Sequence, residues 1–169
     1  MAVSVRNLGT SRDPQTGLLN EEVFRAVADH VVRQALRYQE CLTLIRYELQ
    51  HLREISQAFG RRGYDGALLE FAEILRGSLR KSDVVGRLGE ESYAALLPRT
   101  SSAQADVVIR HVSTALAERN DRNADTFRLM MRTGRTTMDP SVQRASITQL
   151  LAEAEPGPQA TRARARLFG

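Results

Sequence analysis

Apolar residues recur at helical spacing along much of this chain of 169 residues. Val23, Val27 and Val31 repeat every four positions behind Asn20, whose side chain suits a helix N-cap, and they predict a first helix that ends near Arg37. The same periodicity predicts further helices over residues 50–60, 67–79, 103–119 and 147–155.

Shorter segments rich in β-branched and aromatic residues predict strands. Cys41–Glu48 is short, so we expect a buried central strand there. Two alternating runs, 84–88 and 93–97, flank Gly89–Glu90. This pattern predicts a β-hairpin whose turn is centred on the glycine.

The order of these elements indicates the fold class. A last strand is expected over Phe127–Thr133, with Gly134 turning it back into a short second arm, and a basic, glycine-punctuated loop is expected over 61–66. A helix followed by β-α-β-β-α-β predicts a ferredoxin-like α/β sandwich, with a central mixed or antiparallel sheet and flanking helices on one face. We expect a flexible lead (1–12), a domain (13–155) and an Arg/Ala-rich tail (156–169).

Composition narrows the function classes. The net charge of +4 rests on arginine, since Lys81 is the only lysine, and it is spread along the chain. With 5% aromatic residues and no Trp, a nucleic-acid-binding platform is not expected. The lone cysteine, Cys41, excludes an internal disulfide and a cysteine zinc site. Because no apolar run approaches roughly 18 residues, and no signal-peptide core is present, we expect no membrane insertion and a cytoplasmic location.

The predicted hairpin concentrates charge. Glu90 and Glu91 lie at its tip, and an Arg80-x-x-Asp83 pair stands just before its first strand. Carboxylates at a hairpin tip indicate binding or chemistry, because a purely structural tip is more often Asn-Gly or Asp-Gly.

Three spaced motifs resemble the GGDEF, or diguanylate cyclase, family. Asp13–Asn20 is similar to its D-x-L-T-G-L-x-N opening, with Gln15 in place of the apolar residue. Gly60–Asp65 is similar to its G-H-x-x-G-D loop, and Ser82–Leu88 to the approach to its signature. The resemblance runs from residue 13 to about residue 120 and implies the fold of that family.

The signature itself is degenerate. Its five positions are occupied by Gly89, Glu90, Glu91, Ser92 and Tyr93, so the second glycine, the second acid and the phenylalanine have changed. Glu91 keeps the acid that the resemblance implies is a metal ligand and candidate base. Glu90 places a carboxylate where bare backbone should approach a triphosphate, and like charges repel there.

The resemblance also implies a vestigial nucleotide site. Active members carry an aspartate near the end of the first strand that shares magnesium with the signature acid. Arg46 matches that position, cannot bind magnesium, and is expected to pair with Glu91. The segment that follows is two residues longer than the family pattern, and in it Ser56 lies where the family has a nucleotide-contacting asparagine. Asp65 matches the family's aspartate, which the resemblance implies binds the guanine edge. We therefore expect no catalytic residue, no metal site and no cofactor.

A ligand site is implied at the foot of the hairpin. In the resembled family an R-x-x-D five residues before the signature binds cyclic di-GMP, and Arg80 and Asp83 have this spacing. An arginine fork bridges phosphate or guanine O6 and N7, while a carboxylate accepts from guanine N1–H and N2–H. The resemblance implies a stacked pair of cyclic dinucleotides and a further arginine, for which Arg87 and Arg110 are the candidates.

The tetrapeptide alone is weak evidence. R-x-x-D also occurs at Arg62/Asp65 and Arg122/Asp125, and such a pair can simply stabilise a helix end. Only the register relative to Gly89 favours a ligand site at the first hairpin strand.

Three functions remain open at this stage. The leading hypothesis is a catalytically inactive GGDEF-like domain that binds cyclic di-GMP and signals to a protein partner or by self-association. The alternatives are residual cyclase activity or GTP binding through Glu91 and Asp65, and a ligand-free module that dimerises or docks a partner.

Overall fold

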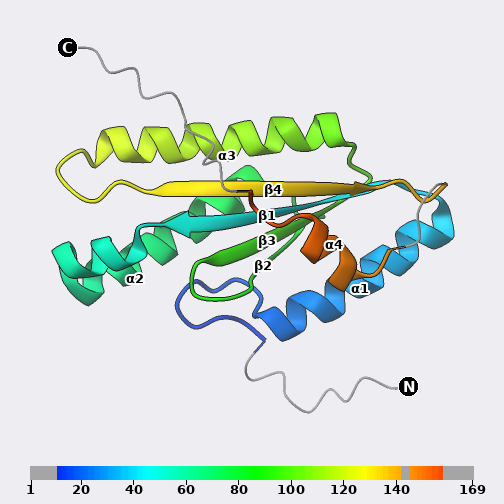
Figure 1. Cartoon of the computed structure of the whole chain (residues 1–169), viewed down its shortest axis with the longest axis horizontal. Helices are drawn as coiled ribbons and strands as arrows, with labels where there is room; N and C mark the ends of the chain where they lie inside the picture. The colour runs from blue at the N-terminus through cyan, green and yellow to red at the C-terminus, as the bar shows by residue number, and fades with distance from the viewer. Residues whose placement is uncertain (1–10, 142–144, 158–169) are drawn as a thin grey trace.

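The elements of the folded chain follow the predicted order (Figure 1). A computed structural model describes residues 11–141 and 145–157. The elements are α1 (Glu21–Tyr38), β1 (Leu42–Gln50), α2 (Leu52–Ser78), β2 (Val84–Arg87), β3 (Ser92–Pro98), α3 (Ser102–Arg122), β4 (Met130–Met138) and α4 (Ile147–Glu153). Most of the predicted lead (residues 1–10) and most of the predicted tail (residues 158–169) lie outside the described residues.

The strands form one antiparallel sheet in the order β2-β3-β1-β4. β1 lies in the centre and pairs with β3 on one side and β4 on the other, which confirms the predicted central strand. β2 and β3 pair as the predicted hairpin, with Val84 opposite Leu96 and Arg87 opposite Tyr93. The predicted sandwich of a central sheet and flanking helices is confirmed.

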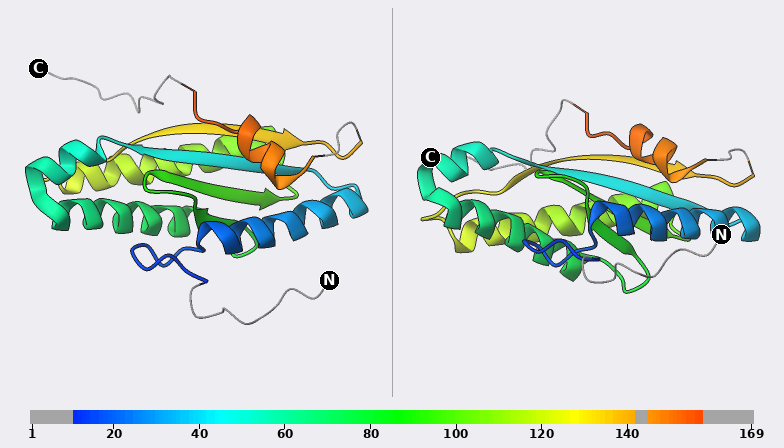
Figure 2. Two further views of the ribbon diagram at one scale, coloured as in Figure 1. Left: turned by 60° about the horizontal axis from the view of Figure 1, so that its bottom comes forward. Right: turned by 90° about the horizontal axis from the view of Figure 1, so that it is seen from below.

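Helices cover both faces of the sheet (Figure 2). Ile45 and Tyr47 of β1 pack with α2 and α3, whereas Leu42 and Leu44 pack with α1 and α4. The expectation of helices on one face is wrong, because the centre of β3 is buried continuously from Tyr93 to Leu97. A strand that is apolar on both sides needs a covering layer on each.

Side-chain caps begin three of the helices. Asn20 accepts a hydrogen bond from the Val23 N–H at 2.9 Å, as predicted for α1. Ser101 and Gln104 form a reciprocal capping box at α3, and Ser146 caps α4. Within residues 11–141 and 145–157, every helix is too short or too polar to cross a lipid bilayer.

The predicted loop over residues 61–66 is wrong, because these residues belong to α2. The break is confined to Gly60, whose φ of 67° and ψ of −166° kink the helix. Gly63 is a packing residue: a Cβ there would lie 2.4 Å from the Cβ of Phe59. Glycine therefore marks a close contact at this position and not a turn.

The predicted doubling back at Gly134 is also wrong. β4 runs straight through Gly134, which pairs with Arg46 of β1. A Cβ at Gly134 would lie 2.3 Å from the carbonyl oxygen of Ala154 and 2.6 Å from that of Glu155. The glycine lets the chain that leaves α4 pass directly over the sheet.

Candidate functional site

The segment 13–20 is a tight turn closed by Asp13. The Asp13 carboxylate accepts from the backbone N–H of Thr16 at 2.9 Å and from its hydroxyl at 2.7 Å. Gly17 takes a φ of 70° and donates its N–H to the Asp13 carbonyl at 2.7 Å. The turn begins at Ser11, whose carbonyl accepts the N–H of the turn's last residue at 3.1 Å. The motif thus fixes where α1 begins.

Arg87, at the end of β2, binds this turn to the hairpin tip. Its Nη1 lies 3.2 Å from both carboxylate oxygens of Asp13 and donates to Oε1 of Gln15. Its Nε and Nη2 each donate at 2.9 Å to the carbonyl oxygens of Gly89 and Glu90. Arg87 is only 7% exposed. Its guanidinium is therefore directed into the protein and not toward the foot of the hairpin.

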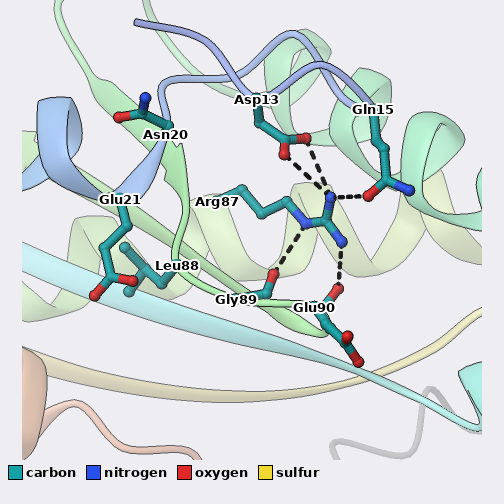
Figure 3. Close-up of a pocket in the computed structure, with 8 residues that line it drawn as sticks. All are labelled: Asp13, Gln15, Asn20, Glu21, Arg87, Leu88, Gly89 and Glu90. Atoms are coloured by element: carbon teal, nitrogen blue, oxygen red, sulfur yellow. Dashed lines mark hydrogen bonds and ion pairs between the residues drawn. The ribbon is translucent and has the colours of Figure 1, made fainter. Parts of the chain in front are cut away.

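An open pocket of about 330 Å³ lies where the turn, α1 and the hairpin tip meet (Figure 3). It is lined by Asp13, Gln15, Asn20, Glu21, Arg87, Leu88, Gly89 and Glu90. Asp13 neutralises the positive charge of Arg87, and two further carboxylates, Glu21 and Glu90, line the pocket. Because like charges repel, this pocket is poorly suited to a triphosphate.

The electrostatics of the turn depend on Asp13. Burial by itself would raise the pKa of Asp13. The hydrogen bonds from Thr16 and the positive charge of Arg87 have the larger combined effect, so the pKa of Asp13 lies below the ordinary aspartate value of 3.8. The stabilisation by this carboxylate is present above its unfolded-state pKa and is lost as pH falls through its lowered folded-state pKa. The ion pair with Arg87 is therefore intact at neutral pH.

Two residues of the expected nucleotide site, Ser56 and Asp65, lie on α2. Ser56 precedes the kink at Gly60, and Asp65 follows it. The Asp65 carboxylate accepts from Nε2 of Gln15 at 3.3 Å, and Arg61 Nε lies 3.6 Å from its other oxygen. Sequence reasoning noted Gln15 only as a departure from the family motif. It missed the contact with Asp65, because no local pattern connects the two positions.

Arg46 does not form the expected ion pair with Glu91. Its Nη1 donates to the carbonyl of Leu151 in α4 at 3.1 Å, and its Nη2 donates to the Ser92 hydroxyl at 3.4 Å. Its Nε is buried and has no hydrogen-bond partner among the described residues. Arg46 thus joins α4 to the sheet.

The carboxylate near the end of β1 is Glu48. Arg46 lies in the middle of this strand, which continues to Gln50. We therefore assign the family's strand acid to Glu48 in place of Arg46. Counting from Glu48 also removes the apparent two-residue insertion before Ser56.

Glu48 lies beside the signature but is bound by an arginine. It pairs in register with Ser92, and the next residue, Leu49, donates its N–H to the Glu91 carbonyl at 2.8 Å. Arg132, directly opposite on β4, forms an ion pair with the Glu48 carboxylate. The side chains of Glu48 and Arg132 are 28% and 25% exposed, so the pair is partly shielded from solvent.

The carboxylates near the signature lie in two different settings. Glu90 and Glu91 are exposed at the tip and take part in none of the ion pairs formed by the described residues. Arg132 already supplies the positive charge that Glu48 requires. Across residues 11–141 and 145–157, no three side chains of His, Cys, Asp or Glu are grouped so that they could hold a metal ion.

The foot of the hairpin presents a different arrangement. The Asp83 carboxylate accepts the backbone N–H of Arg80 at 2.7 Å, and the Asp83 N–H donates to the Arg80 carbonyl at 3.1 Å. These two bonds fix the loop between α2 and β2. They hold the Asp83 carboxylate in place while the Arg80 side chain remains exposed.

Partial burial changes the pKa of the Asp83 carboxyl group. Desolvation raises the pKa of Asp83 above 3.8, opposed by the N–H and the positive charge of Arg80. Burial and then the charge of Asp83 raise the pKa of Tyr47, whose buried hydroxyl has no hydrogen-bond partner among the described residues. The Asp83 carboxylate is therefore near enough to the buried Tyr47 hydroxyl to act on it electrostatically.

The two other R-x-x-D copies differ from this one. Arg62 and Asp65 lie within α2, where Asp65 faces Arg61 and Gln15. Arg122 and Asp125 are both exposed at the end of α3. Neither copy has a carboxylate held by the backbone at the start of a strand.

Arg110 lies on the exposed side of α3. It is close enough to Asp106 to lower the pKa of that carboxyl, although the hydrogen bond from Arg135 is the larger cause. Among the described residues, no hydrogen bond or ion pair joins Arg110 to Arg80 or Asp83. Its part in a ligand site stays a prediction.

Comparison with known proteins gives one family. Residues 10–166 match the family described as "Diguanylate cyclase, GGDEF domain". The diguanylate cyclase TpbB of Pseudomonas aeruginosa is 34% identical over 94 residues, which are 55% of this chain and 22% of that protein. The chain covers 36% of the probable diguanylate cyclase DgcC of Escherichia coli and 16% of the diguanylate cyclase DgcP of Pseudomonas aeruginosa, so it spans well under half the length of these relatives.

Solved structures have the same fold. The GGDEF domain of FimX from Pseudomonas aeruginosa superposes with a TM-score of 0.74 at 23% identity, covering 85% of this chain and 88% of that domain. The GGDEF domain of DgcB from Caulobacter crescentus, solved in complex with c-di-GMP, superposes with a TM-score of 0.73 at 18% identity, covering 91% and 88%.

Proposed function

The chain belongs to the GGDEF family of diguanylate cyclase domains, and on that premise we propose that it is a catalytically inactive member which binds cyclic di-GMP at Arg80 and Asp83. The observation that carries the proposal is the Asp83 carboxylate, fixed by the Arg80 N–H at the foot of the hairpin. The complex of DgcB with c-di-GMP supports the choice of ligand, because that domain has the same fold.

Loss of activity is supported by the Glu48–Arg132 pair. Phosphoryl transfer from GTP needs a divalent cation to neutralise developing charge. In this chain the Arg132 guanidinium forms an ion pair with the Glu48 carboxylate on β1. A divalent cation that binds Glu48 would have to displace Arg132 from this partly buried ion pair. The added carboxylate of Glu90 at the tip further disfavours a triphosphate.

Ligand binding is supported by the chemistry of the hairpin foot. The carboxylate of Asp83 is held by backbone and can accept the N1–H and N2–H of a guanine edge. The exposed guanidinium of Arg80 is available to a phosphate oxygen or to guanine O6 and N7.

The test is a calorimetric titration with cyclic di-GMP. We expect saturable binding by the wild type and a loss of about 1.5–3 kcal/mol, or roughly tenfold or more in affinity, for Arg80→Ala. Arg122→Ala is the matched control, because Arg122 heads an exposed copy of the same tetrapeptide. Absence of wild-type binding below about 100 μM, or equal affinity of Arg80→Ala and wild type, would contradict the proposal.

Residual cyclase activity is a second candidate. It is favoured by Glu48, which places a carboxylate beside the backbone of Glu91. Incubation with GTP and magnesium, followed by chromatography of the products, separates the two functions. Product formation that Glu91→Gln abolishes would replace the receptor proposal with an enzymatic one.

A further inference from the structure

We propose that Gln15 closes the base-binding half of the nucleotide site by occupying Asp65 from within the chain, so that this half-site excludes guanine nucleotides until Gln15 is removed. This inference rests on the proposed function in one respect, namely that the site around Asp65 no longer binds GTP as a substrate. It adds that Gln15 is the residue that keeps guanine nucleotides out of that site.

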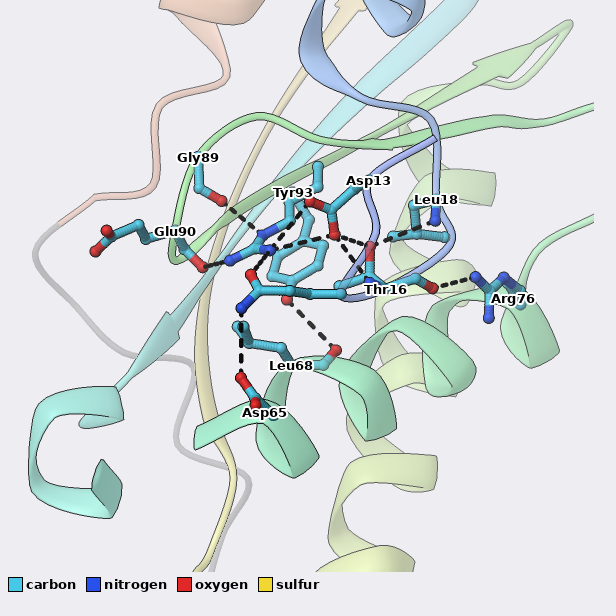
Figure 4. A network of polar contacts seen from close by, with 11 residues as sticks. Asp13, Thr16, Leu18, Asp65, Leu68, Arg76, Gly89, Glu90 and Tyr93 are labelled. Carbon is cyan, nitrogen blue, oxygen red and sulfur yellow. Dashed lines mark hydrogen bonds and ion pairs between the residues drawn. The ribbon is translucent and has the colours of Figure 1, made fainter. Parts of the chain in front are cut away.

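Gln15 bridges two elements that are far apart in sequence. Its Nε2 donates to Oδ1 of Asp65 on α2 at 3.3 Å, and its Oε1 accepts from Nη1 of Arg87 on the hairpin. Figure 4 shows Asp65 below the turn, with its carboxylate directed at this contact. The other carboxylate oxygen of Asp65, Oδ2, lies 3.6 Å from Arg61 Nε in an ion pair in which the Asp65 side chain is 45% exposed and the Arg61 side chain 86% exposed.

The glutamine amide resembles the guanine edge in its hydrogen bonding. A guanine base offers N–H donors to a carboxylate and carries a carbonyl acceptor beside them. A glutamine side chain likewise carries an NH₂ donor and a carbonyl acceptor in one plane. A base that binds Asp65 through Oδ1 therefore competes with a group that already makes the same kind of bond.

The anchoring of Gln15 fixes which way its amide points. The backbone on either side belongs to the turn closed by Asp13 and Thr16. Arg87 can only donate, so Oε1 must face Arg87 and Nε2 must face Asp65. The apolar residue of the family motif could make neither bond, and it would leave the Asp65 Oδ1 acceptor open.

The experiment is a titration of the full chain with GMP, with AMP as the control for base recognition. We expect Gln15→Leu to bind GMP at least tenfold more tightly than the wild type, with no gain for AMP. The double variant Gln15→Leu/Asp65→Asn should lose the gain, since the acceptor for the guanine edge is then altered.

Folding of the variants is checked by thermal melting. If Gln15→Leu does not melt cooperatively, Gln15→Glu replaces it, because a carboxylate keeps the acceptor for Arg87 and removes the donor to Asp65. Equal GMP affinity of the wild type and the folded variant, or an equal gain for AMP, would overturn the inference.

The outcome is independent of the cyclic di-GMP test. Arg80→Ala should leave the gain in GMP binding of Gln15→Leu unchanged, because Arg80 lies at the other end of the hairpin strand. If the chain does not bind cyclic di-GMP, the proposed function is contradicted. The inference about Gln15 is still decided by the GMP titration alone.

Discussion

Two aspartates near the two ends of β2 have pKa values that are shifted in opposite directions. Asp13 is held ionised by Thr16 and Arg87 at the hairpin tip, and its pKa is lowered. Asp83, at the foot, is half-buried, and its pKa is raised by desolvation. The first setting favours a permanent ion pair that stabilises the fold. The second setting disfavours the ionised form of Asp83, so hydrogen-bond donors of a ligand would stabilise that ionised carboxylate.

The raised pKa of Asp83 predicts that cyclic di-GMP binding weakens on acidification. The ligand's guanine N–H groups need an ionised acceptor, so affinity should fall as pH decreases through the raised pKa of Asp83. The stability contribution has the opposite sign: it is present below the unfolded-state pKa and is lost as pH rises through the raised folded-state pKa.

Titrations of cyclic di-GMP at decreasing pH check this prediction. Asp83→Asn is the matched variant, for which we expect weaker binding without this pH dependence. A wild-type affinity that stays constant while Asp83 protonates would show that Asp83 does not contact the ligand.

At the scale of elements, α4 is fastened to the sheet at two adjacent strands. Arg46 on β1 donates to the carbonyl of Leu151, and Gly134, its partner on β4, admits the backbone of Ala154. The helix has only seven residues and is too short to be stable alone. Its position therefore depends on these contacts and on its buried apolar side chains.

Gly134→Ala should destabilise the protein by about 1–3 kcal/mol, because a Cβ would meet carbonyl oxygens of the chain that follows α4. Urea unfolding measures the change. Gly77→Ala is the control: a Cβ there meets nothing within 4 Å, and alanine in the helix should be neutral or stabilise by about 0.5–1 kcal/mol. Equal midpoints for the two variants would show that the chain after α4 is not held against β4.

For the whole molecule, the two faces of the sheet have separate cores, and the hairpin foot lies at an edge. β2 is an edge strand, so the loop that carries Arg80 and Asp83 borders solvent. The stacked pair of cyclic dinucleotides that the family resemblance implies would carry guanine edges and phosphates beyond those that Arg80 and Asp83 bind. A ligand held at this edge can therefore be shared with a second copy of the chain.

Cyclic di-GMP should accordingly shift the wild type toward a dimer. Sedimentation velocity with and without the ligand measures the change, and Arg80→Ala should remain unshifted under the same conditions. A ligand-saturated protein that sediments as the free protein does would restrict signalling to a different partner.

The sequence by itself determined the order of elements, the caps and the hairpin, because these depend on local periodicity and on residues a few positions apart. A ligand site at Asp83 and a degenerate signature stay predictions from the sequence. Glycines were misread at 61–66 and at Gly134, since a glycine needed for close packing looks like a glycine needed for a turn.

Only the tertiary structure decided which residues meet. Arg132 reaches Glu48 across paired strands, and Gln15 reaches Asp65 between a turn and a helix. These partners are 84 and 50 positions apart, and no periodicity connects them. The strand acid was misassigned to Arg46 because its place depends on where β1 ends, which is set by pairing with β3 and β4.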